Sequence, residues 1–276
     1  MPELPEVEHV VRALRRSVVG RTIVAVEVNL PRLIAGISPA SFKRKLHGVR
    51  IEAVNRRGKY ILIELSSLDV LLVHLRMTGK FLIVSEEQPL PPYPHIIFYL
   101  DNDRRLVFCD MRQFGRMRLV AEKKLAKVPQ IELLAPEPLT DNFSFESFRE
   151  TLAKSNRSLK QLLLDQTKVL GLGNIYASEA LFLARISPLK SARTLSKSRA
   201  LRLHQAIRDI LQEAIDAGST LRIDLSDGGG GYFGTTERFW RVYEREGEPC
   251  VNCGTKIKRV VQGGRSTYYC PKCQRA

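Results

Sequence analysis

CVNCGTKIKRVVQGGRSTYYCPKC, residues 250–273, ends the chain with four of its five cysteines. Sixteen residues separate the two C-x2-C pairs, a spacing typical of a zinc site made of four thiolates. A bound metal stabilises a segment too short to bury a core of its own. We therefore predict one structural zinc ion held by Cys250, Cys253, Cys270 and Cys273. Two redox-active dithiols are the alternative, and a lone Cys109 completes the set.

The stretch between the cysteine pairs predicts a β-hairpin. KIKRVV and RSTYY are strand-like runs on either side of Gly263-Gly264, and a glycine pair is a strong hairpin signal. Arg265 then lies at the tip of the hairpin, where a guanidinium can contact a polyanion. The alternative is a purely structural finger whose Arg265 faces water.

The charge of the chain favours a nucleic-acid partner. The 276 residues include 44 Lys and Arg against 29 Asp and Glu, a net charge of +15. An anionic membrane surface is the competing partner, but the sequence has neither a long basic amphipathic helix nor a long apolar run. The start of the chain also lacks a signal-peptide pattern, so we expect a protein of the cytoplasm or nucleoid, with no membrane partner.

The periodicity of the sequence predicts an α+β fold. LPEVEHVVRALRRSVVG (4–20) has the spacing of an amphipathic helix, and strand-like runs follow from Thr22 to about Val120. These runs suggest a β-sandwich or flattened barrel against which the first helix packs. The strand-like runs are TIVAVEVNL, VRIEAVNRR, KYILIEL, VLLVHLRM, HIIFYLD and RLVFCDM.

The second half of the chain is predicted to be helical. Helical periodicity covers FESFRETLAK, SLKQLLLDQ, NIYASEALFLARI and KSRALRLHQAIRDILQEAIDAG, and the glycine-rich stretch 226–234 follows them. We expect four segments: an N-terminal β domain (1–132), a Pro-rich linker (133–144), a helical domain (145–235) and the zinc finger (236–276).

A glycine turn precedes the third of these helices. Gly171 and Gly173 allow the backbone to approach a phosphate, and the helix N-terminus adds affinity for anions. Asn174 can cap that helix or contact a phosphate, and Lys160 lies on the preceding helix. An ordinary helix hairpin has the same pattern, so this turn does not identify a binding site on its own.

Two glycine turns in the first half combine cationic and bulky apolar residues. HLRMTGKF (74–81) contains Met77, and DMRQFGRM (110–117) contains Arg112 and Phe114. Apolar side chains at such turns can enter a base stack, with an arginine filling the space of a displaced base. The alternative is that Met77 and Phe114 are core residues.

The first residues, MPELPEVE, carry chemistry only if they are ordered. Pro5 and Glu6 suit the first turn of a helix, whereas Pro2 and Glu3 could equally be a frayed terminus. If Met1 is removed, Pro2 becomes a secondary α-amine, a class with a pKa of about 8 that is partly neutral at pH 7. Such an amine is a nucleophile, and Glu3 could move protons beside it.

These stretches together resemble the bacterial formamidopyrimidine-DNA glycosylases, which repair oxidised purines. The resemblance runs from Met1 to Cys273 and includes PELPEVE, RRGKY, HLRMTGKF, D-x-R-x-FG, GLGNIYASE and the cysteine finger with GGRSTYYC. It implies an N-terminal β-sandwich, a helix–two-turn–helix domain and a zinc finger, with duplex DNA lying across the cleft between the halves. A monomer is expected because one chain supplies both sides of that cleft.

The resemblance also implies roles for individual residues. It makes Pro2 the nucleophile, Glu3 the carboxylate that handles protons and Glu6 its support. Excision of 8-oxoguanine or formamidopyrimidines would be followed by β,δ-elimination through a Schiff base on Pro2. Lys59 is counted with the catalytic residues and is implied to contact the phosphate that flanks the lesion, while His74, Asn174 and Arg265 are implied to hold the DNA backbone. Met77, Arg112 and Phe114 are implied to fill the gap left by the everted nucleotide. Lys160 is expected to be a DNA-binding residue as well.

The sequence departs from the family pattern at two places. Met111 replaces the usual proline of D-P-R-x-FG, and residues 221–236, which cover the everted base in the family, match only in patches. Two alternatives stay open. One is an endonuclease VIII-like glycosylase for oxidised pyrimidines, although that branch more often begins PEGPE. The other is a catalytically inert zinc-finger DNA-binding protein.

Overall fold

The computed structural model describes residues 1–219, 225 and 240–275. They form two compact units: Met1–Glu132 with part of Gly218–Thr236, and Leu133–Ala217 with part of Glu237–Ala276. The glycine-rich stretch 226–234 and all of 221–236 except Leu225 lie outside the described residues. The expected role of that stretch over an everted base is therefore untested.

Helix α1 (Leu4–Val18) begins the first unit, as its periodicity predicts. Pro5 lies in the first turn, where a missing N–H costs no hydrogen bond. Arg15 and Arg16 lie in the last turn, where their positive charges interact favourably with the negative end of the helix dipole. The apolar stripe that recurs every three to four residues is buried: Val7, Val10, Val11, Leu14 and Val18 are at most 1% exposed.

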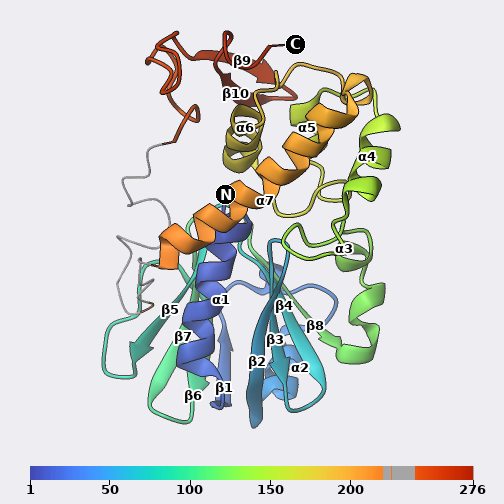
Figure 1. Cartoon of the computed structure of the whole chain (residues 1–276). Helices are drawn as coiled ribbons and strands as arrows, with labels where there is room; N and C mark the ends of the chain where they lie inside the picture. The colour runs from blue at the N-terminus through green and yellow to red at the C-terminus, as the bar shows by residue number, and fades with distance from the viewer. Residues whose placement is uncertain (220–224, 226–239, 276) are drawn as a thin grey trace. The chain divides into compact units, whose positions relative to one another are not determined.

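The strands of the first unit form one antiparallel sheet in the order β5-β7-β6-β1-β2-β3-β4-β8. Only two residue pairs join β1 to β2, so this narrow link divides the sheet into two halves of four strands. In Figure 1, β5, β7 and β6 lie on one side of α1 and β2, β3, β4 and β8 on the other. The core lies between α1 and the inner faces of these strands. The strands are β1 (Thr22–Val28), β2 (Val49–Arg57), β3 (Tyr60–Leu65), β4 (Asp69–His74), β5 (Gly79–Ser85), β6 (Pro94–Leu100), β7 (Arg104–Asp110) and β8 (Arg116–Ala121).

The six strand-like runs read from the sequence all contain strands, but three further elements were not identified. β5 and β8 are the outermost strands of the sheet, and α2 (Pro39–Leu46) is a short helix that buries Phe42 and Leu46. Short connecting elements complete the unit: η1 (Pro31–Leu33), η2 (Glu122–Lys127) and α3 (Pro129–Glu132).

The second unit is helical and ends in the predicted hairpin. Its helices are α4 (Phe145–Ala153), α5 (Leu159–Leu163), α6 (Asn174–Leu183), η3 (Ala192–Thr194) and α7 (Lys197–Ser219). β9 (Lys258–Gln262) and β10 (Arg265–Tyr269) pair around Gly263-Gly264, whose φ angles are 55° and 74°. Positive φ at both central residues is what a two-residue hairpin turn requires, so the glycine pair explains the turn.

A small apolar cluster joins the hairpin module to α6. It contains Phe182 of α6 with Val242, Cys250, Ile257 and Cys270. Among the residues that the structure describes, no helix has the length and apolar content needed to cross a bilayer.

Candidate active site and metal centre

The first residues of the chain are ordered and buried. Pro2 is buried, and Glu3 is only 2% exposed as the residue that precedes α1. The Glu6 carboxylate accepts a hydrogen bond of 2.8 Å from the Glu3 backbone N–H, which satisfies a donor at the helix start and fixes Glu3. The frayed-terminus alternative is therefore wrong.

An arginine connects α1 to the turn that carries Lys59. Arg56 donates to the Glu8 carboxylate at 3.0 Å and to the Gly58 carbonyl at 3.0 Å. Burial alone would raise the pKa of Glu8, but hydrogen bonds from Arg56 and Arg12 outweigh it and lower that pKa. Glu8 therefore stays ionised and holds Arg56, a residue whose role the sequence patterns did not indicate.

Lys59 follows Gly58 in the two-residue turn between β2 and β3. Gly58 has a φ of 56°, which glycine adopts without strain, and Lys59 is only 4% exposed. Tyr60, the next residue, pairs with His74 across β3 and β4, which brings Lys59 and His74 close in the fold, and the Lys59 charge contributes to the lowered pKa of His74. A cation held in such a sheltered position interacts more strongly with a phosphate than a solvated one does.

His74 is a neutral hydrogen-bond donor in this site. Burial, with smaller effects of the Arg76 and Lys59 charges, lowers the pKa of His74 to about 3. The Arg76 backbone N–H donates to His74 Nδ1 at 3.0 Å, and the ring packs edge-on against Tyr60 with centroids 4.7 Å apart. Because Nδ1 accepts, the proton of the neutral ring is on Nε2, which is the form that can donate to a phosphate oxygen.

The predicted gap-filling side chains are exposed. Met77 is 42% exposed and Phe114 48%, so the alternative that both are core residues is wrong. The Arg112 guanidinium lies over the Phe114 ring, 5.1 Å from its centroid. This cation–π contact keeps the Arg112 guanidinium next to the Phe114 ring and limits the orientations of both side chains.

In the second unit, the glycine turn before α6 connects to the hairpin. Gly171 has a φ of 86°, and Gly173 rather than Asn174 occupies the position that precedes α6. The Asn174 side-chain amide donates to the Ser266 carbonyl at 2.9 Å. Ser266 directly follows the exposed Arg265, so this bond joins two segments predicted to contact DNA that are 92 residues apart.

Lys160 does not present its charge at the surface. Its side chain is 0% exposed, and its ammonium donates to the Asn174 carbonyl at 2.7 Å and to the Ser178 hydroxyl. A direct DNA contact, as expected from the sequence, is at odds with this burial, because leaving these partners would cost charge-assisted hydrogen bonds. Lys160 instead holds the first turn of α6 from within.

Glu179 organises the segment that leads into the hairpin module, although no pattern singled it out. It is 0% exposed on α6, and its carboxylate accepts from the backbone N–H groups of Arg241, Val242 and Tyr243 at 2.9 to 3.0 Å. The Arg241 guanidinium lies 3.7 Å away. A buried carboxylate with these partners fixes the path of residues 241–243.

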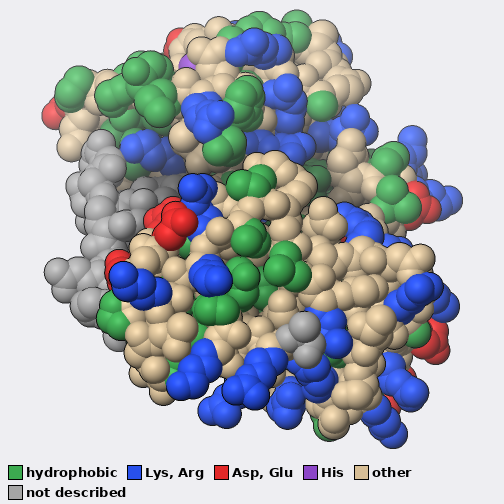
Figure 2. Space-filling view, turned by 90° about the horizontal axis from the view of Figure 1, so that it is seen from above, with side chains coloured by type: hydrophobic (Ala, Val, Ile, Leu, Met, Phe, Trp, Pro, Cys, Tyr) green, Lys and Arg blue, Asp and Glu red, His purple; other side chains and the backbone are tan. Residues whose placement is uncertain are grey.

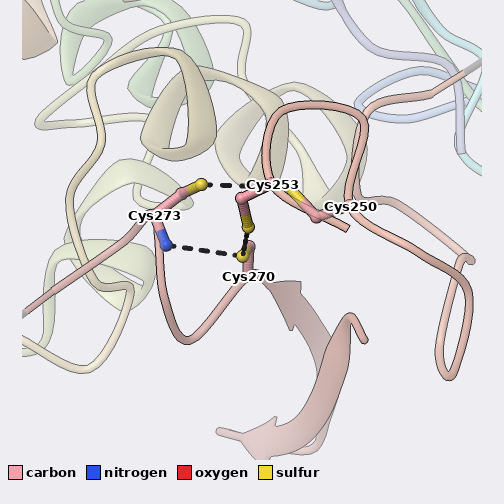
Figure 3. A group of neighbouring side chains, drawn as sticks. All are labelled: Cys250, Cys253, Cys270 and Cys273. Atoms are coloured by element: carbon pink, nitrogen blue, oxygen red, sulfur yellow. Dashed lines mark hydrogen bonds between the residues drawn. The ribbon is translucent and has the colours of Figure 1, made fainter. Parts of the chain in front are cut away.

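The four predicted metal ligands converge (Figure 3). Their ligand atoms all lie within 4.8 Å of one another, with sulfur separations of 3.9 Å for Cys250–Cys273 and 3.5 Å for Cys253–Cys270. Tetrahedral zinc with bonds of about 2.3 Å places sulfurs about 3.8 Å apart, so the set fits one zinc ion.

The chemistry of the four sulfurs also fits a cation. Burial and hydrogen bonds with the neighbouring thiols raise the pKa of Cys273 to about 12, whereas hydrogen bonds from Thr255 lower the pKa of Cys253 to about 6, so the four sulfurs are not all thiolates on their own. A bound divalent cation favours the deprotonated form of all four thiols. Gln274 supports the site: it accepts from the Cys270 N–H at 2.8 Å and donates to the Ile186 carbonyl at 3.0 Å.

Lys and Arg side chains greatly outnumber Asp and Glu on the face shown in Figure 2. This distribution agrees with the net charge of +15 and favours binding to a polyanion. The fold and site together define a zinc-finger, DNA-binding enzyme class with an ordered proline and carboxylate at the start of its first helix.

Comparisons with known proteins place the chain within that class. Residues 1–117 match the formamidopyrimidine-DNA glycosylase N-terminal domain, 134–224 the H2TH domain of the same enzymes, and 247–276 the zinc finger found in FPG and IleRS. The formamidopyrimidine-DNA glycosylase of Pelotomaculum thermopropionicum is 46% identical over 275 residues, which is 100% of this chain and 99% of that protein.

Solved structures agree with these matches. The Lactococcus lactis Fpg bound to DNA with an abasic site is 36% identical, with a TM-score of 0.91 over 99% of this chain and 100% of that one. A MutM structure with DNA containing carbocyclic 8-oxo-G is also 36% identical, with a TM-score of 0.90 over the full length of both chains. The chain belongs to the formamidopyrimidine-DNA glycosylase family, whose members are DNA glycosylases and abasic-site lyases of base-excision repair.

Proposed function

We propose that this chain excises oxidised purines, namely 8-oxoguanine and formamidopyrimidines, from duplex DNA and then cleaves the abasic site. The observation that carries the proposal is the ordered start of the chain: Pro2 is buried and Glu3 is 2% exposed and fixed by Glu6. An inert DNA-binding protein has no need of these two residues in such an arrangement. The structures of relatives with abasic-site and 8-oxo-G DNA support the same substrates.

The chemistry follows from a secondary amine beside a carboxylate. Once Met1 is removed, the Pro2 nitrogen attacks C1′ of the damaged nucleotide, the C1′–N bond breaks, and the base leaves with the bonding electrons and gains a proton. Glu3 protonates the ring oxygen O4′, so that the sugar opens and the nitrogen becomes an iminium cation. This cation accepts electrons when a C2′ proton is removed, which expels the 3′ phosphate. Removal of the C4′ proton from the resulting unsaturated iminium then expels the 5′ phosphate. Water then releases Pro2 from the sugar remnant.

We propose that the other site residues hold the DNA in place. Lys59 and His74 contact phosphates beside the lesion, and Asn174 and Arg265 contact the backbone from the second unit. Met77, Arg112 and Phe114 enter the gap left by the everted nucleotide, which suits their exposure. Lys160 contributes indirectly, through Asn174.

Borohydride trapping tests the reaction. Borohydride reduces the iminium to a stable amine, so the wild-type protein with its Met1 removed is expected to form a covalent adduct with a duplex that contains 8-oxoguanine. Pro2→Gly keeps an N-terminal amine but loses the secondary amine, and its adduct should decrease strongly. Absence of an adduct from wild-type protein with a confirmed Pro2 terminus, or an undiminished adduct from Pro2→Gly, would falsify the proposal.

The same assay separates the alternative substrates. Trapping with thymine glycol in place of 8-oxoguanine measures activity toward oxidised pyrimidines, and a stronger adduct with thymine glycol would favour an endonuclease VIII-like activity. Mass spectrometry of the N-terminus identifies an inert protein, because retained Met1 blocks the Pro2 nitrogen.

We further propose that the protein acts as a monomer in the bacterial cytoplasm or nucleoid. Its proposed substrate, chromosomal DNA, is found there, and a reducing compartment keeps the four thiols available for zinc. The four-part domain division, with boundaries after residues 132, 144 and 235, remains part of this proposal.

A further inference from the structure

Asp110, the last residue of β7, is a buried carboxylate at which two loops meet. It is 0% exposed. Its Oδ1 atom accepts from the Thr78 hydroxyl and from the Arg112 backbone N–H at 3.2 Å, and its Oδ2 atom accepts from the Gly115 N–H at 2.7 Å. One loop carries Met77, and the other carries Arg112 and Phe114. The carboxylate therefore ties together the two loops whose side chains are proposed to enter the DNA.

The main chain of Asp110 extends these links to a third loop. Its N–H donates to the Tyr93 carbonyl at 3.3 Å, and its own carbonyl accepts from His95 Nε2 at 2.8 Å and from the Gln113 N–H at 3.1 Å. Because a carbonyl only accepts, His95 carries its proton on Nε2. Tyr93 is 52% exposed, so the third loop also presents a large side chain to solvent.

Each of these three loops contains a non-glycine residue in the left-handed region. The φ angles are 58° for Arg76, 60° for Tyr93 and 58° for Gln113. Such conformations are uncommon for residues with a Cβ atom and persist only where the surroundings enforce them. Backbone hydrogen bonds with Asp110 constrain Tyr93 and Gln113, and the bond from the Arg76 N–H to His74 Nδ1 constrains Arg76.

Two glycines allow the loops to come this close. A Cβ atom at Gly115 would lie 2.6 Å from the Phe108 ring, and one at Gly79 would lie 2.4 Å from the Leu75 carbonyl and 2.9 Å from the same ring. Both loops thus pack on Phe108, which is itself fully buried. The backbone beneath the exposed side chains is closely packed and hydrogen-bonded.

We infer that Asp110 and Thr78 are positioning residues for eversion of the damaged nucleotide, because they hold Met77, Arg112 and Phe114 in one fixed arrangement before DNA binds. A rigid set of wedges loses little conformational entropy on entering the base stack, which lowers the barrier to eversion. This inference rests on the proposed glycosylase function. It predicts a defect confined to substrates whose base must be moved out of the stack.

The experiment compares two substrates, using the full-length, zinc-loaded protein with a processed N-terminus. The first is a duplex with 8-oxoguanine, which requires eversion, and the second is a single strand with a preformed abasic site, which does not. Asp110→Asn places an amide N–H₂ against donors, and Thr78→Val removes one hydroxyl with little change in shape. The matched control is Asp101→Asn, whose carboxylate also accepts from a backbone N–H, that of Thr22 at 3.0 Å, but lies outside these loops.

Under single-turnover conditions, Asp110→Asn is expected to slow excision from the duplex by about tenfold or more, with a smaller effect for Thr78→Val. Cleavage of the single-stranded abasic site should be unchanged in both variants, and Asp101→Asn should match the wild type on both substrates. Fluorescence of 2-aminopurine beside the lesion should report slower eversion in Asp110→Asn and Thr78→Val.

Equal losses on the two substrates in both variants, or unchanged excision from the duplex, overturns the inference. Thr78→Val keeps the test decisive if Asp110→Asn does not fold. A wild-type protein that cleaves neither substrate refutes the proposed function itself, which is a different result from an active wild type whose variants show no selective defect.

Discussion

Replacing Glu179 with Gln changes one buried group and leaves the shape of the side chain nearly the same. In the native protein, one carboxylate oxygen accepts from the N–H groups of Val242 and Tyr243 at 2.9 and 3.0 Å, and the other accepts from the Arg241 N–H at 3.0 Å. In Glu179→Gln, the amide oxygen can still accept hydrogen bonds from the Val242 and Tyr243 N–H groups, but the side-chain N–H₂ group then faces the Arg241 N–H. One charge-assisted hydrogen bond is replaced by two opposed donors.

The structure sets the size of the expected effect. A buried hydrogen bond to a charged group contributes about 1.5–3 kcal/mol, and the two remaining bonds weaken when the acceptor loses its charge. We expect the free energy of local opening at residues 241–243 to fall by about 3 kcal/mol, which is roughly a 100-fold loss of amide protection. Hydrogen exchange at these three amides measures this free energy directly.

Glu213→Gln is the matched control. Glu213 also contacts Arg241, at 2.9 Å, but its side chain is 52% exposed. Exposed ion pairs contribute at most about 1 kcal/mol, so protection at residues 241–243 should change by less than about fivefold. A loss of protection below about tenfold in Glu179→Gln, or equal losses in the two variants, refutes the assignment of Glu179 as the anchor of this segment.

Three further predictions concern pH, metal and salt. Because the folded-state pKa of His74 is lowered to about 3, the unfolded chain binds more protons than the folded chain between pH 6.5 and 3. The free energy of unfolding should therefore fall as pH decreases through this window, and His74→Gln should reduce that dependence, as urea titrations at several pH values can show. Chelation of zinc should unfold the finger and abolish DNA binding in a gel-shift assay, and normal binding by zinc-free protein would contradict the role of the finger. DNA affinity should fall steeply with salt, and Arg265→Ala should reduce the slope of log K against log salt by about 1 if Arg265 contacts a phosphate.

The elements with a strong local signal were predictable from the sequence. The first helix has an apolar stripe and helix-start chemistry within a few residues, and the hairpin has a glycine pair between two strand-like runs. The metal site has fixed cysteine spacing. In each case the interactions that define the element lie within about twenty residues of one another, so the sequence displays them side by side.

Elements that depend on distant partners were harder to predict. β5 and β8 each have a neighbour on one side only, and the strand tendency of β8 is weakened by Arg116 and Arg118. The hydrogen bond between Thr78 and Asp110 spans 32 residues, and those of Glu179 span 62 to 64. A single sequence gives no sign that these particular polar residues meet.

Lys59 and Lys160 show why the type of a residue does not determine its role at a binding site. Both were expected to contact DNA, and both are nearly or fully buried, at 4% and 0% exposed. Lys59 lies in the turn that precedes Tyr60, the partner of His74 across β3 and β4, and its charge helps to lower the pKa of His74, which is compatible with the phosphate contact proposed for it. Lys160 uses its ammonium on the carbonyl of Asn174 and the hydroxyl of Ser178, and these bonds leave the Asn174 side chain to contact the hairpin. Lys160→Met should therefore disturb DNA binding through the position of Asn174 and Arg265, and should change the salt dependence of binding less than Arg265→Ala does.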